Sequence, residues 1–206
     1  MSVTVIADLL KDTEEFFQRM PAAATQAARM ALNDTARGPA LKMARDEIYD
    51  QVNFPAGYLG NDRLFVSKLA RNDDLEASIT GRDRPTSLAR FATRAQVGQR
   101  GVEVQVHRGN TKFMKKAFIV KLRAGRAMDG KQHNLGLAIR LAPGEELINR
   151  NFPSEVHATR LGPNVLLLYG PSVDQVFRSV SSDIQPQVLD AATTEFFRQF
   201  ARLTNG

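Results

Sequence analysis

Apolar residues recur at every fourth position near the C-terminus, and this spacing constrains the fold more than any other feature of the sequence. The positions are Ile184, Val188, Ala192, Phe196 and Phe200. Residues four apart lie on one face of an α-helix, so the pattern predicts an amphipathic helix over about residues 172–203. Its apolar face needs a covering layer from elsewhere in the chain. Pro186 lies either in the first turn of this helix or at a kink within a longer one.

A turn marks the start of this helix. Gly170 and Pro171 end the preceding apolar segment, and Ser172 is followed three residues later by Gln175, which is the pattern of a capping box. Gly-x-Ser also begins the nucleophile elbow of hydrolases, but that motif needs a second glycine where Asp174 stands. We therefore interpret Gly170, Pro171 and Ser172 as a structural turn and helix cap.

The N-terminal quarter also has helical patterns, over about residues 8–52. A capping box at 12–15 precedes apolar residues spaced three and four apart, many of them alanine. Such small side chains indicate that a neighbouring element packs closely against this helix. Gly38 and Pro39 end or bend the segment. A further helical face, reaching about residue 52, consists of Leu41, Ala44 and Ile48.

The middle of the chain, about residues 75–169, is predicted to form a β-rich core. Val102, Val104 and Val106 alternate with polar residues, which gives a strand one buried face. Further strands are predicted at 75–79, 88–92, 117–122, 136–141 and 165–169, while 63–70 suits a short helix or a strand. The connections are too short for crossover helices, so we expect antiparallel pairing.

Together these patterns predict an α+β fold in a single domain over residues 1–206. A mainly antiparallel sheet or sandwich is flanked by the long N-terminal helical segment and by the amphipathic C-terminal helix. The hydrophobic fraction of 43% is ordinary for a globular protein and supplies a core of this size.

The net charge of +6 is unevenly distributed. Between Arg82 and Lys131 there are thirteen Lys or Arg and three acidic residues, a local charge of +10, which leaves −4 for the rest of the chain. Such a segment attracts a phosphate backbone or an acidic protein surface, and it also suits a solvated sheet face. The basic residues around the strand at 117–122, interleaved with Phe113 and Phe118, are Lys112, Lys115, Lys116, Lys121, Arg123 and Arg126. We predict that these six contact DNA or an acidic partner without reading base sequence.

No recognisable catalytic set is present in the sequence. The chain has no cysteine, which excludes disulfides and thiolate-bound metals. Residues 125–131 resemble a phosphate-binding loop, but Gln132 stands where Ser or Thr binds magnesium, and no helical pattern follows. The three histidines lie far apart and lack the spacing of a zinc site. We therefore expect no enzyme activity, metal, cofactor or small-molecule substrate, and no membrane span, because no stretch approaches the ~20 apolar residues required.

Short motifs are spread along the chain from about residue 20 to residue 203. They are Ala-Leu-Asn-Asp-Thr-Ala at 31–36, Leu-Glu-Ala-Ser-Ile at 75–79, Leu-Ala-Arg-Phe at 88–91, Val-Glu-Val at 102–104, Lys-Lys-Ala-Phe-Ile at 115–119, and Leu-Tyr-Gly-Pro-Ser-Val at 168–173 with Val-Phe at 176–177. In this order they resemble the prophage minor tail protein Z family of tailed bacteriophages. The Gly-Pro-Ser-Val turn into a helix is the most specific motif, and residues 145–165 depart from the family pattern.

The resemblance implies a non-enzymatic virion component that is assembled in the host cytoplasm and completes the tail at or near the head–tail junction. Its implied partners are other tail and neck proteins and further copies of the chain, in a ring for which the general symmetry of tails suggests six-fold order. Non-specific contact of the basic residues with phage DNA in the tail lumen is a further expectation.

Two alternatives stay open. The first is a free nucleic-acid-binding accessory protein, for recombination or packaging, which is not retained in the virion. The second is an NTPase built on residues 125–131, which replacement of Lys131 tests.

Overall fold

The computed structural model describes residues 3–4, 21–60, 62–93, 101–122, 134–145 and 158–204. The chain divides into two compact units. The helical unit comprises Met1–Tyr49, Leu59–Asp83 and Val173–Gly206, and the β unit comprises Asp50–Tyr58 and Arg84–Ser172. The sequence alone predicts a single domain over residues 1–206 with a β-rich core from residue 75; in the structure, residues 75–83 belong to the helical unit.

Four helical elements form most of the described helical unit. They are α2 (Pro21–Thr35), the π-helical segment η2 (Ala36–Ala40), α3 (Leu41–Gln51) and α4 (Val173–Thr204). Gly38 and Pro39, predicted to end or bend the N-terminal segment, lie inside η2. Proline has no N–H to donate, and a π-helical turn accommodates that break in the α-helical hydrogen bonds. Pro186 lies inside α4, so of the two predicted possibilities the structure has the longer helix, which contains the proline, rather than a helix that starts at it.

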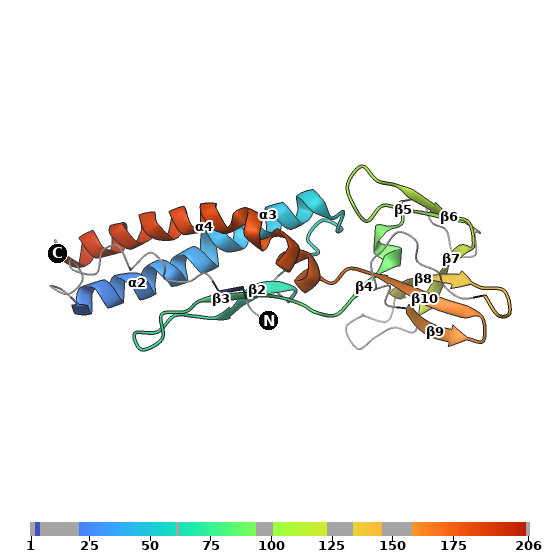
Figure 1. Cartoon of the computed structure of the whole chain (residues 1–206), viewed down its shortest axis with the longest axis horizontal. Coiled ribbons are helices and arrows are strands. Elements are labelled where there is room, and N and C mark those ends of the chain that lie inside the picture. Colours follow the sequence, from blue (N-terminus) through green and yellow to red (C-terminus); the bar gives the residue numbers. More distant parts are fainter. Residues whose placement is uncertain are drawn as a thin grey trace. The chain divides into compact units, whose positions relative to one another are not determined.

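The alanine stripe of α2 packs against α4, as Figure 1 shows by the parallel course of the two ribbons. The buried residues of this contact are Ala24, Ala27, Ala28 and Ala31 from α2 and Phe196 and Phe200 from α4. The small side chains of α2 admit the two phenyl rings, whose centroids lie 6.0 Å apart in a stacked arrangement. The alanine stripe of α2 and the stripe of α4 are thus confirmed, and Phe196 and Phe200 of α4 cover the alanines of α2. The predicted helical residues 8–20, with the capping box at 12–15, lie outside the described residues.

A three-stranded antiparallel sheet completes the helical unit, in the order β1 (Val3–Thr4), β3 (Ser78–Gly81) and β2 (Leu64–Lys68). The segment 63–70, which suited a helix or a strand, is a strand. The strand predicted at 75–79 begins only at Ser78. Gly81 joins this sheet to α4, because a Cβ at this glycine would lie 2.7 Å from the Cα of Asp174. The backbone N–H of Asp174 donates to the carbonyl of Arg82 at 3.2 Å.

The β unit contains a five-stranded sheet built around β10 (Val165–Gly170). Its other strands are β4 (Thr86–Ser87), β7 (Ala117–Leu122), β8 (Asn134–Arg140) and β9 (Ala158–Gly162). β10 pairs with β8, β9 and β4, and β7 pairs with β8. A separate hairpin joins β5 (Val102–Val104) to β6 (Lys112–Met114). All strand pairings among the described residues are antiparallel, and the predicted α+β class is confirmed.

The strand predicted at 88–92 is wrong, because Leu88–Phe91 forms the 3₁₀-helix η3. Leu88 and Phe91 are three residues apart, which is one turn of a 3₁₀-helix and places both on the same side. Both side chains lie against Gly170: a Cβ there would be 2.9 Å from Phe91 and 3.4 Å from Leu88. Phe91 also packs on Phe54, with ring centroids 5.4 Å apart, at the centre of the β-unit core.

Candidate functional site

Four of the six predicted contact residues fall among the described residues, all in the β unit. Lys112 begins β6, Lys115 and Lys116 form the turn between β6 and β7, and Lys121 lies near the end of β7. All four are exposed. Arg123 and Arg126, like the phosphate-loop-like segment 125–131, lie outside the described residues.

Lys116 is engaged by a carboxylate of its own chain. Its Nζ lies 2.6 Å from Oε1 and 2.8 Å from Oε2 of Glu145. The backbone N–H of Ala142 donates to the same carboxylate at 2.7 Å. This N–H and the Lys116 ammonium together lower the pKa of Glu145. The charge of Lys116 is therefore largely balanced within the β unit, and Lys115 is the turn residue better placed to attract an external anion.

Lys121 is separated from this turn by the length of β7. Five residues of extended strand span about 16 Å, so Lys116 and Lys121 lie at opposite ends of the strand. Lys121 pairs with Leu135 of β8, which is 46% exposed. The structure thus places the four described lysines on β6, in the turn after it and on β7, and it does not bring Lys121 to the turn.

Phe113 was predicted to interleave with the lysines as an aromatic platform. Its ring is 62% exposed and rests on Gly101, where a Cβ would lie 2.4 Å from the ring and where φ is +82°. Side chains alternate along a strand, so Phe113 and Lys112 are on opposite faces of β6. The residue paired with Phe113 is Glu103, a carboxylate. The hairpin therefore sets the exposed ring beside an acidic group rather than in a basic groove.

The fold nevertheless separates charge between the two units. Over their full residue ranges, the β unit has fifteen Lys or Arg and six Asp or Glu, a net charge of +9. The helical unit has thirteen and sixteen, a net charge of −3, and the two values add to the +6 of the whole chain. The acidic residues 73, 74 and 76 belong to the helical unit, so the charge separation follows the boundary between the units.

The residues Gly170, Pro171 and Ser172, predicted as a structural turn and helix cap, lie between β10 and α4. α4 begins at Val173, directly after Ser172, and Ser172 is fully buried. Burial removes the hydroxyl from the surface position that a nucleophile elbow requires. Next to it, the buried carboxylate of Asp174 accepts from the guanidinium of Arg178 one helical turn further on.

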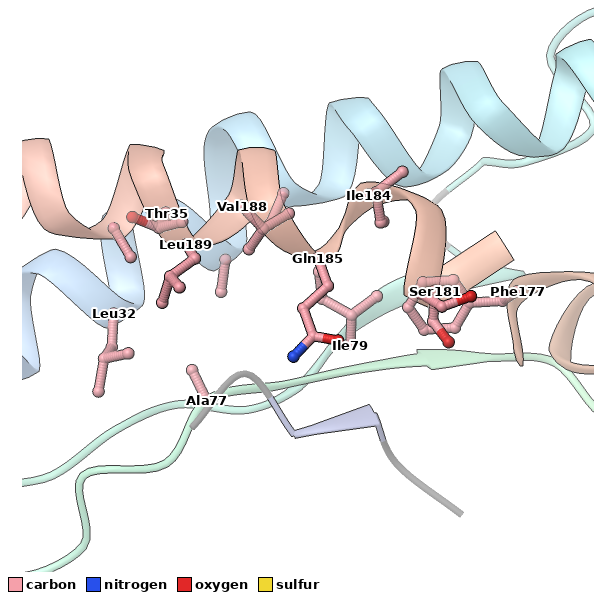
Figure 2. Close-up of a pocket in the computed structure, with 14 residues that line it drawn as sticks. Leu32, Thr35, Ala77, Ile79, Phe177, Ser181, Ile184, Gln185, Val188 and Leu189 are labelled. Atoms are coloured by element: carbon pink, nitrogen blue, oxygen red, sulfur yellow. The ribbon is translucent and has the colours of Figure 1, made fainter. Parts of the chain in front are cut away.

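An apolar groove of about 190 Å³ opens in the helical unit between α2, α4 and the segment leading into β3. Figure 2 shows Ala77 and Ile79 on one side of it, with Val188, Leu189 and the amide of Gln185 from α4 on another. Thr35 also lines it, and its buried hydroxyl oxygen has no hydrogen-bond partner. Sequence patterns do not indicate this groove, because its walls come from three segments far apart in the chain.

A second unexpected surface is the edge strand β9 of the β unit. Residues 158–161 are exposed on both faces of the strand, and Leu161 is 47% exposed. β9 pairs only with β10 among the described strands. The pairing has a bulge: Gly162 faces Val165 and Arg160 faces Leu166, so Leu161 has no residue opposite it. A bulge of this kind redirects a side chain away from the sheet.

Among the described residues, no group of three or more His, Asp or Glu side chains is placed to hold a metal ion. His107 lies in the β unit with Nδ1 3.3 Å from the carbonyl oxygen of Gln51, and the other two histidines are outside the described ranges. No described helix has the length and apolar character needed to cross a membrane. No protein-family model matches this sequence, and no curated protein or solved structure shows significant similarity to it.

Proposed function

We propose that this chain is a non-enzymatic structural subunit of a tailed-phage virion, resembling minor tail protein Z, that completes the tail at or near the head–tail junction. The proposal has two supports of different kinds. Surfaces suited to protein contacts favour an assembly subunit, and the sequence motifs favour this particular phage family.

The apolar groove of the helical unit is the observation that carries the assembly role. Its walls are predominantly apolar, with Ala77, Ile79 and Val188 facing a volume of about 190 Å³ that no described side chain fills. Leaving apolar surface in water costs about 25 cal/mol per Å². A groove of this kind is a common site for an apolar side chain of a partner.

Four of the motifs that carry the family resemblance meet in the β unit. Phe91 of the motif at 88–91 contacts Gly170 of the motif at 168–173. The carbonyl of Phe91 accepts from the N–H of Gln105 at 2.9 Å, next to the motif at 102–104. The N–H of Gly101 donates to Ala117, in the motif at 115–119, at 2.9 Å. Four motifs thus surround one packed region, where side-chain size and turn geometry restrict the sequence.

The charge of +9 on the β unit supports contact with an anion in the assembled tail. In this proposal Lys115 and Lys121 face either DNA passing through the lumen or an acidic neighbouring subunit. Contact with phosphates in the lumen is non-specific and weakens steeply as salt rises, so that DNA is held without being trapped.

Electron microscopy of particles from a phage with this gene inactivated tests the proposal. We expect separate heads and tails, or joined particles that fail to infect, and restoration by the wild-type gene supplied in trans. Normal and infectious particles without the gene product would refute the tail-completion role.

The charge of the β unit also favours a second function, a nucleic-acid-binding accessory protein that is not retained in the virion. Binding of a fluorescent DNA duplex by the purified protein, measured at about 50 and 200 mM salt, tests it. The variant Lys115→Glu with Lys121→Glu should weaken binding and reduce the salt dependence. Lys116 is left unchanged because it pairs with Glu145. Strong binding combined with absence of the protein from purified virions would favour this second function over the first.

A further inference from the structure

The exposed ring of Phe113 is held in place by the backbone of its own hairpin. Phe113 is the middle residue of β6 and is 62% exposed. The tip of its ring lies over Gly101, where a Cβ would be 2.4 Å from Cζ and 3.0 Å from Cε2. The N–H of Gly101 donates to the carbonyl of Ala117 at 2.9 Å, so the backbone under the ring is itself fixed. A partner therefore meets a ring that is already positioned, which lowers the entropic cost of contact.

A carboxylate lies beside this ring. Glu103 is paired with Phe113 across the hairpin, and residues directly opposite each other in antiparallel strands project from the same face. The hydroxyl of Thr93 donates to Oε2 of Glu103 at 3.3 Å, which orients the exposed carboxylate. Among the residues that the structure describes, no cation forms an ion pair with Glu103 or stacks on Phe113. The hairpin thus presents an exposed aromatic ring and an unpaired carboxylate on one surface.

This combination matches the chemistry of arginine. A guanidinium is planar, so it stacks on an aromatic ring while its N–H groups donate to a carboxylate. The face of the ring also attracts the positive charge. An aliphatic side chain would instead cover the carboxylate without giving it a donor, and an anionic group would be repelled by it. Only a cation with N–H donors uses both groups.

We propose that Phe113 and Glu103 form a docking site for an arginine side chain of a partner protein. The guanidinium stacks on the ring and donates to Oε1 of Glu103, the oxygen that Thr93 does not contact. The net charge of +9 on the β unit repels a cation at long range, but at about 0.15 M salt the Debye length is about 8 Å. The adjacent carboxylate therefore acts at contact distance while more distant charges are screened. This site goes beyond the proposed function and does not depend on the phage assignment, because it is defined by the hairpin alone.

Nuclear magnetic resonance of the isotope-labelled full chain, titrated with a capped Gly-Arg-Gly tripeptide, tests the site. At about 0.15 M salt we expect the backbone signals of Gly101, Glu103 and Phe113 to shift in proportion to peptide concentration. The control peptide carries citrulline, which has the shape and N–H donors of arginine without its charge. Its shifts should be at least about threefold smaller at equal concentration, because both the ring and the carboxylate favour a cation.

Two variants separate the ring from the carboxylate. Glu103→Gln keeps the size of the side chain and its acceptor for Thr93 but removes the charge, and Phe113→Leu keeps an apolar side chain but removes the aromatic ring. Each should reduce the arginine-dependent shifts of Gly101 about two- to fivefold. Matched controls on α4 are Phe197→Leu and Asp190→Asn, at an exposed ring and an exposed carboxylate, and they should leave the shifts unchanged.

The outcomes of this titration are distinct. Shifts that are confined to the hairpin, that exceed those with citrulline and that fall in both variants support the site. Equal shifts with the two peptides, shifts that persist in both variants, or no shift at the highest soluble peptide concentration would each overturn it. All four substituted positions are exposed, so the variants should keep the melting temperature of the wild type. If Phe113→Leu fails to fold, the comparison of the two peptides on the wild type and on Glu103→Gln still decides the result. A negative result leaves the phage proposal standing, since electron microscopy of particles tests that separately.

Discussion

The side-chain amide of Gln199 in α4 donates a hydrogen bond of 3.0 Å to the carboxylate of Asp34 in α2, across 165 residues of sequence. The same nitrogen donates to Oε1 of Glu195 at 2.7 Å. Gln199 is buried, and its Oε1 has no hydrogen-bond partner. This amide holds two carboxylates together at the helix pair.

Replacing this amide by a carboxylate should make the helix pair sensitive to pH. Gln199→Glu places a third, buried carboxylate beside Asp34 and Glu195, and we expect it to destabilise the protein by about 3 kcal/mol at pH 7. Burial and like charges raise the pKa of the introduced group, so its cost should shrink as the pH falls through that raised value. Urea unfolding at pH 7 and pH 5 measures both costs. The uncharged control Gln199→Met should cost about 1 kcal/mol at either pH, and an equal cost of Gln199→Glu at the two pH values would contradict the prediction.

Glu195 should contribute a pH-dependent part of the stability. Its pKa is lowered, first by the guanidinium of Arg198 and also by the amide of Gln199. A carboxyl whose folded pKa is depressed stabilises the fold above its unfolded pKa and loses that effect as the pH falls through the folded value. The difference in unfolding free energy between the wild type and Glu195→Gln should therefore be full at pH 6–7 and should decline below about pH 4.5. A difference that stays constant from pH 7 to pH 3 would show that the charge of Glu195 is not its source.

The alanines of α2 should tolerate no larger side chain where α4 passes. Ala27 is fully buried in this contact, and Ala27→Leu should destabilise the protein by about 1–3 kcal/mol because the added carbons displace Phe196 or Phe200. Ala22→Leu, at an exposed position of the same helix, is the matched control and should change stability by less than about 0.5 kcal/mol. Chemical denaturation compares the two, and equal effects would mean that the helices are not closely packed at Ala27.

Glycine should be required at position 81 for steric reasons. A Cβ there would lie 2.7 Å from the Cα and 2.8 Å from the nitrogen of Asp174, and these backbone atoms cannot rotate away. Gly81→Ala should therefore destabilise the protein by about 2 kcal/mol or more. Gly38→Ala should instead stabilise it by about 0.5–1 kcal/mol, since nothing lies within 4 Å and Gly38 is helical. Thermal melts of both variants compare their melting temperatures with that of the wild type. A melting temperature of Gly81→Ala at or above the wild-type value would contradict the prediction.

The elements that local periodicity encodes were predictable from sequence. The strands at 117–122, 136–141 and 165–169 and the stripe from Ile184 to Phe200 agree with the structure within a few residues. Periodicity failed at Leu88–Phe91, where the shape of the space around Gly170 selects a 3₁₀-helix over a strand. The candidate surfaces were even harder to predict from the sequence. The exposed position of Leu161, for example, arises from a bulge in the pairing of β9 with β10.

Most of the helices and strands, the start of α4 and the basic part of the chain were predictable from the sequence. These properties depend on side-chain spacing, capping and composition, all of which are local. Three other features became evident only in the folded chain: residues 59–83 join the helical unit, Lys116 is paired with Glu145, and three distant segments leave a groove beside α4. Those outcomes depend on contacts between residues far apart in the chain, and the energy of such contacts is set by packing and charge in space rather than by order along the sequence.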